Sequence, residues 1–268
     1  MDIALDARHT PGFERSQPGS HYRSHMDPSD FYTGIVPDVY TALRGSHFDA
    51  TRYREFVREH GEPALELGCG DDGPFFALVA DGLDVEGIDS SADMVARGQR
   101  RLEAEGRDAR IHHQRMEQLS LNRSFTSIYL AGPTFNLLPD DATAAKALEA
   151  IARHLQPSGA ALVPLWTPHP TPAEQIGVVN STIIGESTAQ YTVLSEDYDE
   201  AARTRTTVLR YELNSAGVHT VEDREWIIHW YSDDDFRRLA KAAGLDVEFT
   251  RISDDQVEAV LQRTESGL

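Results

Sequence analysis

Three glycines in the stretch LELGCGDDGPF have the spacing G-x-G-x-x-G, and an aspartate follows at a distance that suits a nucleoside. Gly68, Gly70 and Gly73 allow a tight turn from a strand into a helix and let a ligand approach the backbone closely. Asp89 lies 19 residues after Gly70, where its carboxylate can accept hydrogen bonds from both hydroxyls of a ribose. The pattern predicts half of a nucleoside-binding site; the alternative is a strand–helix turn that merely needs glycines.

The charges around this turn favour a cationic nucleoside over a dinucleotide. Asp71 and Asp72 occupy the helix N-terminus at which a pyrophosphate would bind, and they would repel it. Glu66, in the preceding strand, also suits a cation better than an anion. S-adenosylmethionine carries an ammonium and a sulfonium and no phosphate, so electrostatics favours it over NAD. An NAD-dependent oxidoreductase is the first alternative.

Alternating strands and helices must position these residues. The sequence predicts strands at 63–68, 83–89, 109–116, 125–132, 159–166, 245–252 and 257–264, and helices at 73–82, 90–106, 140–155 and 232–244. From Tyr191 to Trp230 apolar and polar residues alternate, which indicates antiparallel strands. The order predicts an α/β fold with a doubly wound, mostly parallel sheet. We expect an N-terminal arm and helical lid at 1–60 and a core at 61–268, with an antiparallel β insertion at about 170–231.

Composition excludes several classes of function. The chain has 268 residues and a net charge of −19, so it should repel phosphate backbones and anionic membranes, and we expect neither nucleic acid nor membrane as a partner. It has no apolar run of about 18 residues and no signal-peptide pattern at its N-terminus. The single cysteine fits a reducing cytoplasm. These features predict a cytoplasmic protein.

Several segments resemble successive motifs of class I S-adenosylmethionine-dependent methyltransferases. They are LELGCG, GIDSSADMVARGQRRL and HLQPSGAALV, together with VYTALRGSHFDATRYREFV, which resembles the entrance segment of the small-molecule members. The late segment WYSDDDFRRLAKAAGLDVEF is similar to enzymes that act on amino sugars, antibiotics and other small metabolites. The resemblance implies a seven-stranded Rossmann-like fold, S-adenosylmethionine as the cofactor and S-adenosylhomocysteine as the product.

The resemblance also assigns residues to the cofactor. They are Tyr40, Glu66, Gly68, Cys69, Gly70, Asp89, Ser90, Met94, Arg115, Met116, Glu117, Leu130, Ala131 and Gly132. Within this set, the glycine loop would follow the methionine moiety, Asp89 would hold the ribose, and Met116 and Glu117 would frame the adenine. Arg115 is a departure, because many relatives have an adenine-binding aspartate there. The acidic loop GDDGPF and the turn QPSG also depart from the usual family pattern.

The acceptor of the methyl group should lie beside the N-terminal arm, the loops after the fourth and fifth strands, and the β insertion. His169, in WTPHPTP, is the best-placed candidate base, and a surface loop residue is its alternative. Tyr22, Tyr32 and Tyr40 could line the pocket or accept hydrogen bonds from an ammonium; a helix face packed on the sheet is the alternative. Phe135 and Trp166 are candidate walls, with core packing as the alternative.

No metal site is expected. His21 and His25 are four residues apart and could lie on one helix face, but no acidic partner of suitable spacing accompanies them. An amine acceptor needs no metal, whereas a neutral hydroxyl is a poor nucleophile without a metal or a base. We therefore predict methylation of an amine, or less favourably a hydroxyl, on a metabolite such as an amino sugar or antibiotic precursor. A non-catalytic cofactor-binding subunit is the second alternative, and a homo-oligomer formed through the β insertion stays open.

Overall fold

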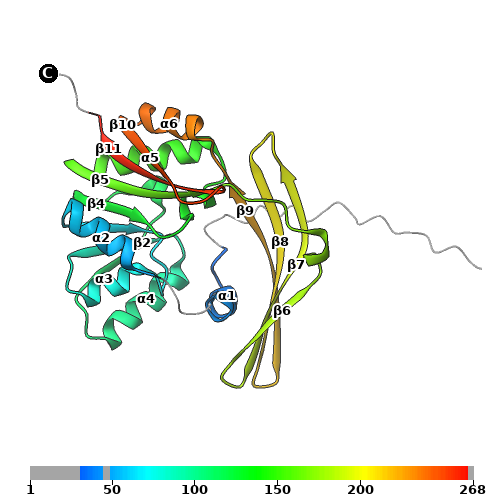
Figure 1. The fold of residues 1–268 in the computed structure, drawn as a ribbon. Helices are drawn as coiled ribbons and strands as arrows, with labels where there is room; N and C mark the ends of the chain where they lie inside the picture. Colours follow the sequence, from blue (N-terminus) through cyan, green and yellow to red (C-terminus); the bar gives the residue numbers. More distant parts are fainter. Residues whose placement is uncertain (1–30, 45–48, 265–268) are drawn as a thin grey trace, which may run out of the picture.

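The computed structural model describes residues 31–44 and 49–264, and two β-sheets organise them (Figure 1). The larger sheet has the strand order β10-β11-β5-β4-β1-β2-β3. Only β11 runs antiparallel to its neighbours β10 and β5. Its strands are β1 (Ala64–Leu67), β2 (Val85–Asp89), β3 (Arg110–His113), β4 (Phe125–Leu130), β5 (Leu155–Trp166), β10 (Leu245–Arg251) and β11 (Gln256–Arg263). The predicted doubly wound, seven-stranded and mostly parallel sheet is therefore confirmed.

Helices cover both faces of this sheet, and each face has its own apolar core. The helices α2 (Thr51–His60), α3 (Pro74–Ala80) and α4 (Ala92–Ala104) lie on one face, and α5 (Asp141–His154) and α6 (Asp233–Ala242) lie on the other. Every residue of β1 and of β2 is buried, as expected for parallel strands covered on both sides. No helix in the described ranges is long and apolar enough to cross a membrane.

Local sequence fixes the ends of the helices that follow the site-forming strands. Pro74 stands at the first position of α3, where its missing N–H costs no hydrogen bond. Gly82, after α3, has φ +84°, a left-handed conformation that a glycine adopts without strain. The hydroxyl of Ser91 caps α4 by accepting from Met94 N–H. These signals hold the turns after β1 and β2 in place.

The second sheet is antiparallel and curves around α1 (Val36–Arg44), which lies between it and the larger sheet (Figure 1). Its strands are β6 (Val179–Ile184), β7 (Ser187–Asp199), β8 (Thr204–Ser215) and β9 (Val218–His229). Phe31, Val36 and Val39 pack on its inner face against Leu209 and Tyr211. The alternation of β8, in which Arg205, Thr207, Leu209 and Tyr211 are buried, follows from one face packing and the other remaining open.

The structure corrects three predicted boundaries. The strand β6 was not predicted, and β7 begins at Ser187 rather than Tyr191. The third strand ends at His113, and the one-turn helix η2 (Met116–Gln118) replaces its predicted end. The fifth strand begins at Leu155, directly after α5. The division of the chain into an arm and a core near residue 60 stays a prediction.

Candidate functional site

A cavity of about 730 Å³ lies at the carboxyl ends of β1, β2 and β4, the edge at which open α/β sheets bind ligands. The loop after each of these strands contributes to its lining, as does Trp166 at the end of β5. The opposite wall comes from Tyr32 and Tyr40 beside or within α1, and from Trp226 and Ile228 of β9. The cavity therefore joins the core to the second sheet.

The glycine loop after β1 makes a close turn that only glycine tolerates. Gly68 has φ +76°, and a Cβ atom there would lie 2.7 Å from Cγ2 of Thr134. The N–H groups of Gly68 and Cys69 donate to the carbonyl of Ile88, at 2.8 and 2.9 Å. Cys69 is buried against Gly87, so it fills space behind the loop. The turn at Gly68 and Gly70 therefore lets a ligand approach the backbone closely.

Asp89 ends β2 with its carboxylate fixed at the cavity wall. Oδ2 accepts from Gly70 N–H at 2.9 Å, and Oδ1 accepts from Ser91 N–H at 2.8 Å. Burial raises the pKa of Asp89, and the two backbone hydrogen bonds oppose that rise. Because a carboxylate has about four lone-pair sites, each oxygen keeps capacity for one further donor, such as a ribose hydroxyl.

Glu66 is the most unusual ionisable group of the cavity. It is fully buried, and its carboxylate oxygens make no hydrogen bond of good geometry among the described residues, although the Tyr129 hydroxyl and the Phe75 backbone lie near enough to oppose the rise of its pKa. Burial raises its pKa to about 8. The hydroxyl of Tyr129 is buried beside this carboxyl group, and the pKa of Tyr129 is raised by burial and by Glu66. A buried carboxyl group with free oxygens at a cavity wall is suited to a cationic ligand.

The loop after β4 forms the floor between the two halves of the cavity. Gly132 N–H donates to the hydroxyl of Tyr53 at 2.8 Å, and Thr134 Oγ1 donates to the carbonyl of Ala131 at 2.7 Å. Farther from the glycine loop the lining becomes apolar and aromatic. The ring centroids of Tyr32 and Tyr40 are 5.2 Å apart in an edge contact. The cavity thus has one acidic and one aromatic half.

Most of the predicted site residues line this cavity. The cofactor candidates among them are Tyr40, Glu66, Gly68, Cys69, Gly70, Asp89, Ser90, Met94, Arg115, Met116, Glu117, Ala131 and Gly132, and the acceptor candidates are Tyr32 and Trp166. The structure brings these residues together from six separate segments of the chain. It describes where they lie, and their roles stay predictions.

Three of the predicted residues that the structure describes are not brought to the cavity. Leu130 is fully buried at the end of β4. Phe135 is fully buried and packs on Tyr231 and Phe236, so the core alternative describes it. The side chain of His169 is exposed outside the lining, and its backbone carbonyl accepts from Arg205. Tyr22 lies outside the described residues, as do His21 and His25.

The second sheet contributes residues that the sequence pattern does not single out. Trp226 and Ile228 line the cavity, although the alternation of their segment predicts only a strand. Thr134 and Leu137 from the loop after β4, and Lys146 from α5, also line it. The alternation in segment 218–229 predicts which side chains share a face of the strand. It does not predict which face points to the cavity, because that depends on how the second sheet packs on the core.

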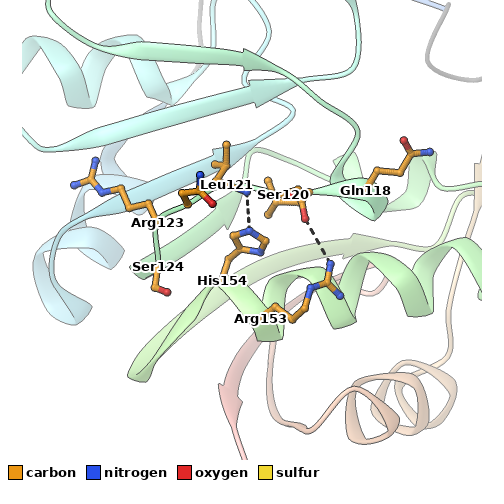
Figure 2. A pocket seen from close by; sticks show the side chains of 9 residues that line it. Gln118, Ser120, Leu121, Arg123, Ser124, Arg153 and His154 are labelled. Atoms are coloured by element: carbon orange, nitrogen blue, oxygen red, sulfur yellow. Dashed lines mark hydrogen bonds between the residues drawn. The ribbon is translucent and has the colours of Figure 1, made fainter.

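A second hollow, of about 540 Å³, lies at the far end of β4 and α5 (Figure 2). There His154 accepts from Leu121 N–H through Nε2 at 3.0 Å, and its Nδ1 is 2.8 Å from the carbonyl of Ala150. Arg153 donates to the carbonyl of Leu119. These side chains make hydrogen bonds to the neighbouring backbone. We therefore assign the hollow a structural role and not a ligand-binding one. In the described ranges no cluster of three metal-binding side chains occurs.

Comparison with known proteins decides between the two cofactors considered from the sequence. A family model described as a methyltransferase domain matches residues 64–159, a segment that contains the glycine loop, Asp89 and the loop after β4. Residues 64–159 therefore form a methyltransferase domain. Its cofactor is S-adenosylmethionine, and the alternative of a non-catalytic subunit is set aside.

Individual relatives of this methyltransferase are known in sequence and in structure. It is 29% identical, over 86% of its length and 91% of the relative's, to a dTDP-3-amino-3,6-dideoxy-alpha-D-glucopyranose N,N-dimethyltransferase from Streptomyces fradiae. A sugar N-methyltransferase from a Streptoalloteichus species superposes with a TM-score of 0.68 at 19% identity, over 96% of this chain and all of that one. An amino pentose methyltransferase from Micromonospora, with S-adenosylmethionine bound, gives 0.64 at 20% identity, over 87% and 98%. Both structures share the fold.

Proposed function

We propose that the protein methylates the amine of a nucleotide-linked amino sugar. The observation that carries the proposal is the similarity to the Streptomyces fradiae N,N-dimethyltransferase, which extends over 86% of the chain and so includes the second sheet as well as the cofactor half. The shape of the cavity agrees with it. A volume of about 730 Å³ is within the range of sites that hold a drug-sized ligand.

The acidic half of the cavity fits the charges of the cofactor. Five acidic residues line this half of the cavity: Glu66, Asp71, Asp72, Asp89 and Glu117. Their charges are complementary to a cationic cofactor. Glu66 is the best candidate to hold the ammonium, because its oxygens are buried and make no hydrogen bond of good geometry within the described residues. Asp89 has oxygens free for the ribose hydroxyls, and the glycine loop lets the methionine moiety approach the backbone.

S-adenosylmethionine supplies an electrophilic methyl group, which passes to the acceptor nitrogen as the carbon–sulfur bond breaks and S-adenosylhomocysteine forms. For this in-line displacement the protein must mainly hold the two partners close and aligned. Tyr32, Tyr40, Trp166 and Trp226 wall the aromatic half and would exclude water there. Burial raises the pKa of Tyr32 well above its ordinary value, so its hydroxyl stays neutral and can hydrogen-bond the amine.

The aromatic half of the cavity is better suited to an amine acceptor than to a hydroxyl, because an amine needs no general base there. No histidine is among the described residues that line the cavity, and Tyr32 is too weakly acidic to act as a base at neutral pH. A neutral amine is nucleophilic without a base. The amine would enter without its extra proton, become an ammonium on methylation, and lose a proton to water before a second transfer.

Three acceptors test the proposal: a nucleotide-linked amino sugar, the matching nucleotide-linked hydroxy sugar, and the free amino sugar. We expect S-adenosylhomocysteine to form with the first, and mass spectrometry to detect one or two added methyl groups on its nitrogen. Asp89→Asn should lose cofactor binding, while Asp246→Asn, an exposed acid on β10, is the matched control. Methylation of the hydroxy sugar alone, or of none of the three while the cofactor binds, would refute the amine assignment.

A further inference from the structure

Residues 31–44, here named the lid segment, connect the two halves of the cavity. Tyr32, Tyr40 and Thr41 from this segment line the cavity. On its other side, Phe31 and Val36 pack on the inner face of the second sheet, and Figure 1 shows α1 between that sheet and the core. The position of the lid segment therefore decides where the aromatic half of the cavity lies.

Three residues at the start of α4 hold the lid segment to the core. The hydroxyl of Ser91 donates to the carbonyl of Tyr32 at 2.6 Å. Asp93 accepts from Gly34 N–H at 3.0 Å through Oδ2. Arg97 Nη2 donates to Asp38 Oδ1 at 2.8 Å. Together they contact the lid segment at three points between Tyr32 and α1.

The same turn also reaches the cofactor half. Ser91 N–H donates to Asp89 Oδ1 at 2.8 Å, so neighbouring atoms of one residue contact the candidate ribose ligand and the lid segment. Arg97 Nη1 lies 3.8 Å from Asp71 Oδ2 on the glycine loop. A continuous series of polar contacts thus runs from the cofactor half, through the first turns of α4, to the lid segment.

We propose that Asp93 and Arg97 are positioning residues that keep the lid segment closed against α4 and thereby place Tyr32 and Tyr40 in the wall of the acceptor half. Asp93 is exposed and Arg97 is partly exposed, and polar pairs of this kind contribute little to global stability. Their effect is on a local equilibrium between a closed and an open lid segment. The assignment of the aromatic half to the acceptor rests on the proposed function, whereas the contacts between α4 and the lid segment do not.

Hydrogen exchange of the full chain, alone and with S-adenosylhomocysteine, tests the proposal directly. In Arg97→Met and Asp93→Ala, we expect the amides of residues 39–44 to exchange about tenfold faster than in the wild type, since each change removes a hydrogen bond to a charged group. Amides of β1 and α5 should keep their rates. Asp93→Asn, whose amide oxygen still accepts, and Arg97→Lys should restore part of the protection. Arg100→Met, on an exposed position of the same helix, is the control.

Kinetics supply the second readout. Both disruptive variants should raise the KM of the acceptor about tenfold and the dissociation constant of S-adenosylhomocysteine by less, because Tyr40 and Asp71 also line the cavity, while the melting temperature stays close to that of the wild type. Unchanged exchange at 39–44, or an equal increase in Arg100→Met, would overturn the proposal. Failure of S-adenosylhomocysteine to bind any variant would instead refute the proposed function, because the exchange difference is expected in the unliganded protein as well.

Discussion

The buried carboxyl group of Glu66 should make cofactor binding depend on pH. With a pKa of about 8, only about one molecule in ten carries the charged form of Glu66 at pH 7. If the cofactor ammonium binds the charged form, binding must release the proton. The affinity should then rise about 20-fold between pH 6 and pH 7.5. In this window the cofactor ammonium, like other α-amino groups, remains mostly protonated.

Glu66→Gln removes the titration while keeping the shape of the side chain. In this variant, the affinity for the cofactor should no longer change with pH through ionisation of residue 66. It should match the wild type near pH 6, where Glu66 is mostly neutral, and bind more weakly at pH 7.5. Asp89 also titrates with a raised pKa, but its contribution is present in both proteins and cancels in the comparison.

Isothermal titration in buffers of different ionisation enthalpy measures both quantities. For the wild type at pH 7 we expect about 0.9 proton released for each cofactor bound, and for Glu66→Gln a value near zero from this group. If the two proteins release the same number of protons, and their affinities change in parallel with pH, Glu66 is not the group that meets the ammonium.

The same pKa has a consequence for the unliganded protein. Since the folded pKa of Glu66 lies above its ordinary value of 4.5, the neutral form contributes stability that is fully present below pH 4.5 and is lost as pH rises through 8. The loss by pH 8 is on the order of 4 kcal/mol. Urea unfolding at pH 5 and pH 8.5 should show this loss in the wild type and a smaller one in Glu66→Gln; equal losses would contradict the assignment.

Three further substitutions test the geometry of the cavity. Gly68→Ala should abolish cofactor binding and lower the free energy of unfolding by about 1–2 kcal/mol, measured by titration and urea unfolding, because φ +76° and the 2.7 Å approach leave no room for a Cβ. Asn136→Ala should cost about 2–4 kcal/mol of stability in the same unfolding assay, because its buried side chain makes three hydrogen bonds to the ends of β5 and β9. Trp226→Ala should raise the KM of the acceptor at least tenfold and leave the cofactor dissociation constant unchanged; weaker cofactor binding would place this residue in the other half.

The fold and the cofactor half could be predicted because their signals are local. The glycine spacing, Pro74 after the loop and the cap at Ser91 each act within a few residues, and parallel strands buried on both faces form apolar runs. Asp89 follows the second strand at the distance that the βα unit requires. The carboxyl ends of neighbouring parallel strands meet at one edge, so the order of elements alone brings these residues together.

The acceptor half could not be predicted in the same way. Phe135 and Trp166 both sit where a strand ends, yet the tertiary structure buries Phe135 against α6 and turns Trp166 to the cavity. His169 has the chemistry of a base, but the loop after β5 leaves its side chain exposed. Trp226 enters only because the second sheet folds over α1. Its position depends on contacts such as that of its ring with Phe31, 195 residues earlier in the chain (226 − 31), and the local periodicity of the sequence does not record such contacts.

The sequence by itself thus determined the alternation of strands and helices, the glycine turn and the acidic character of the cofactor half, since backbone conformation and charge belong to individual residues and their neighbours. Only the tertiary structure decided that Glu66 is fully buried beside Tyr129, that α4 contacts the lid segment, and that β9 contributes to the wall of the cavity. Burial and enclosure arise from the packing of distant segments, and they set the pKa values and the walls on which methyl transfer depends.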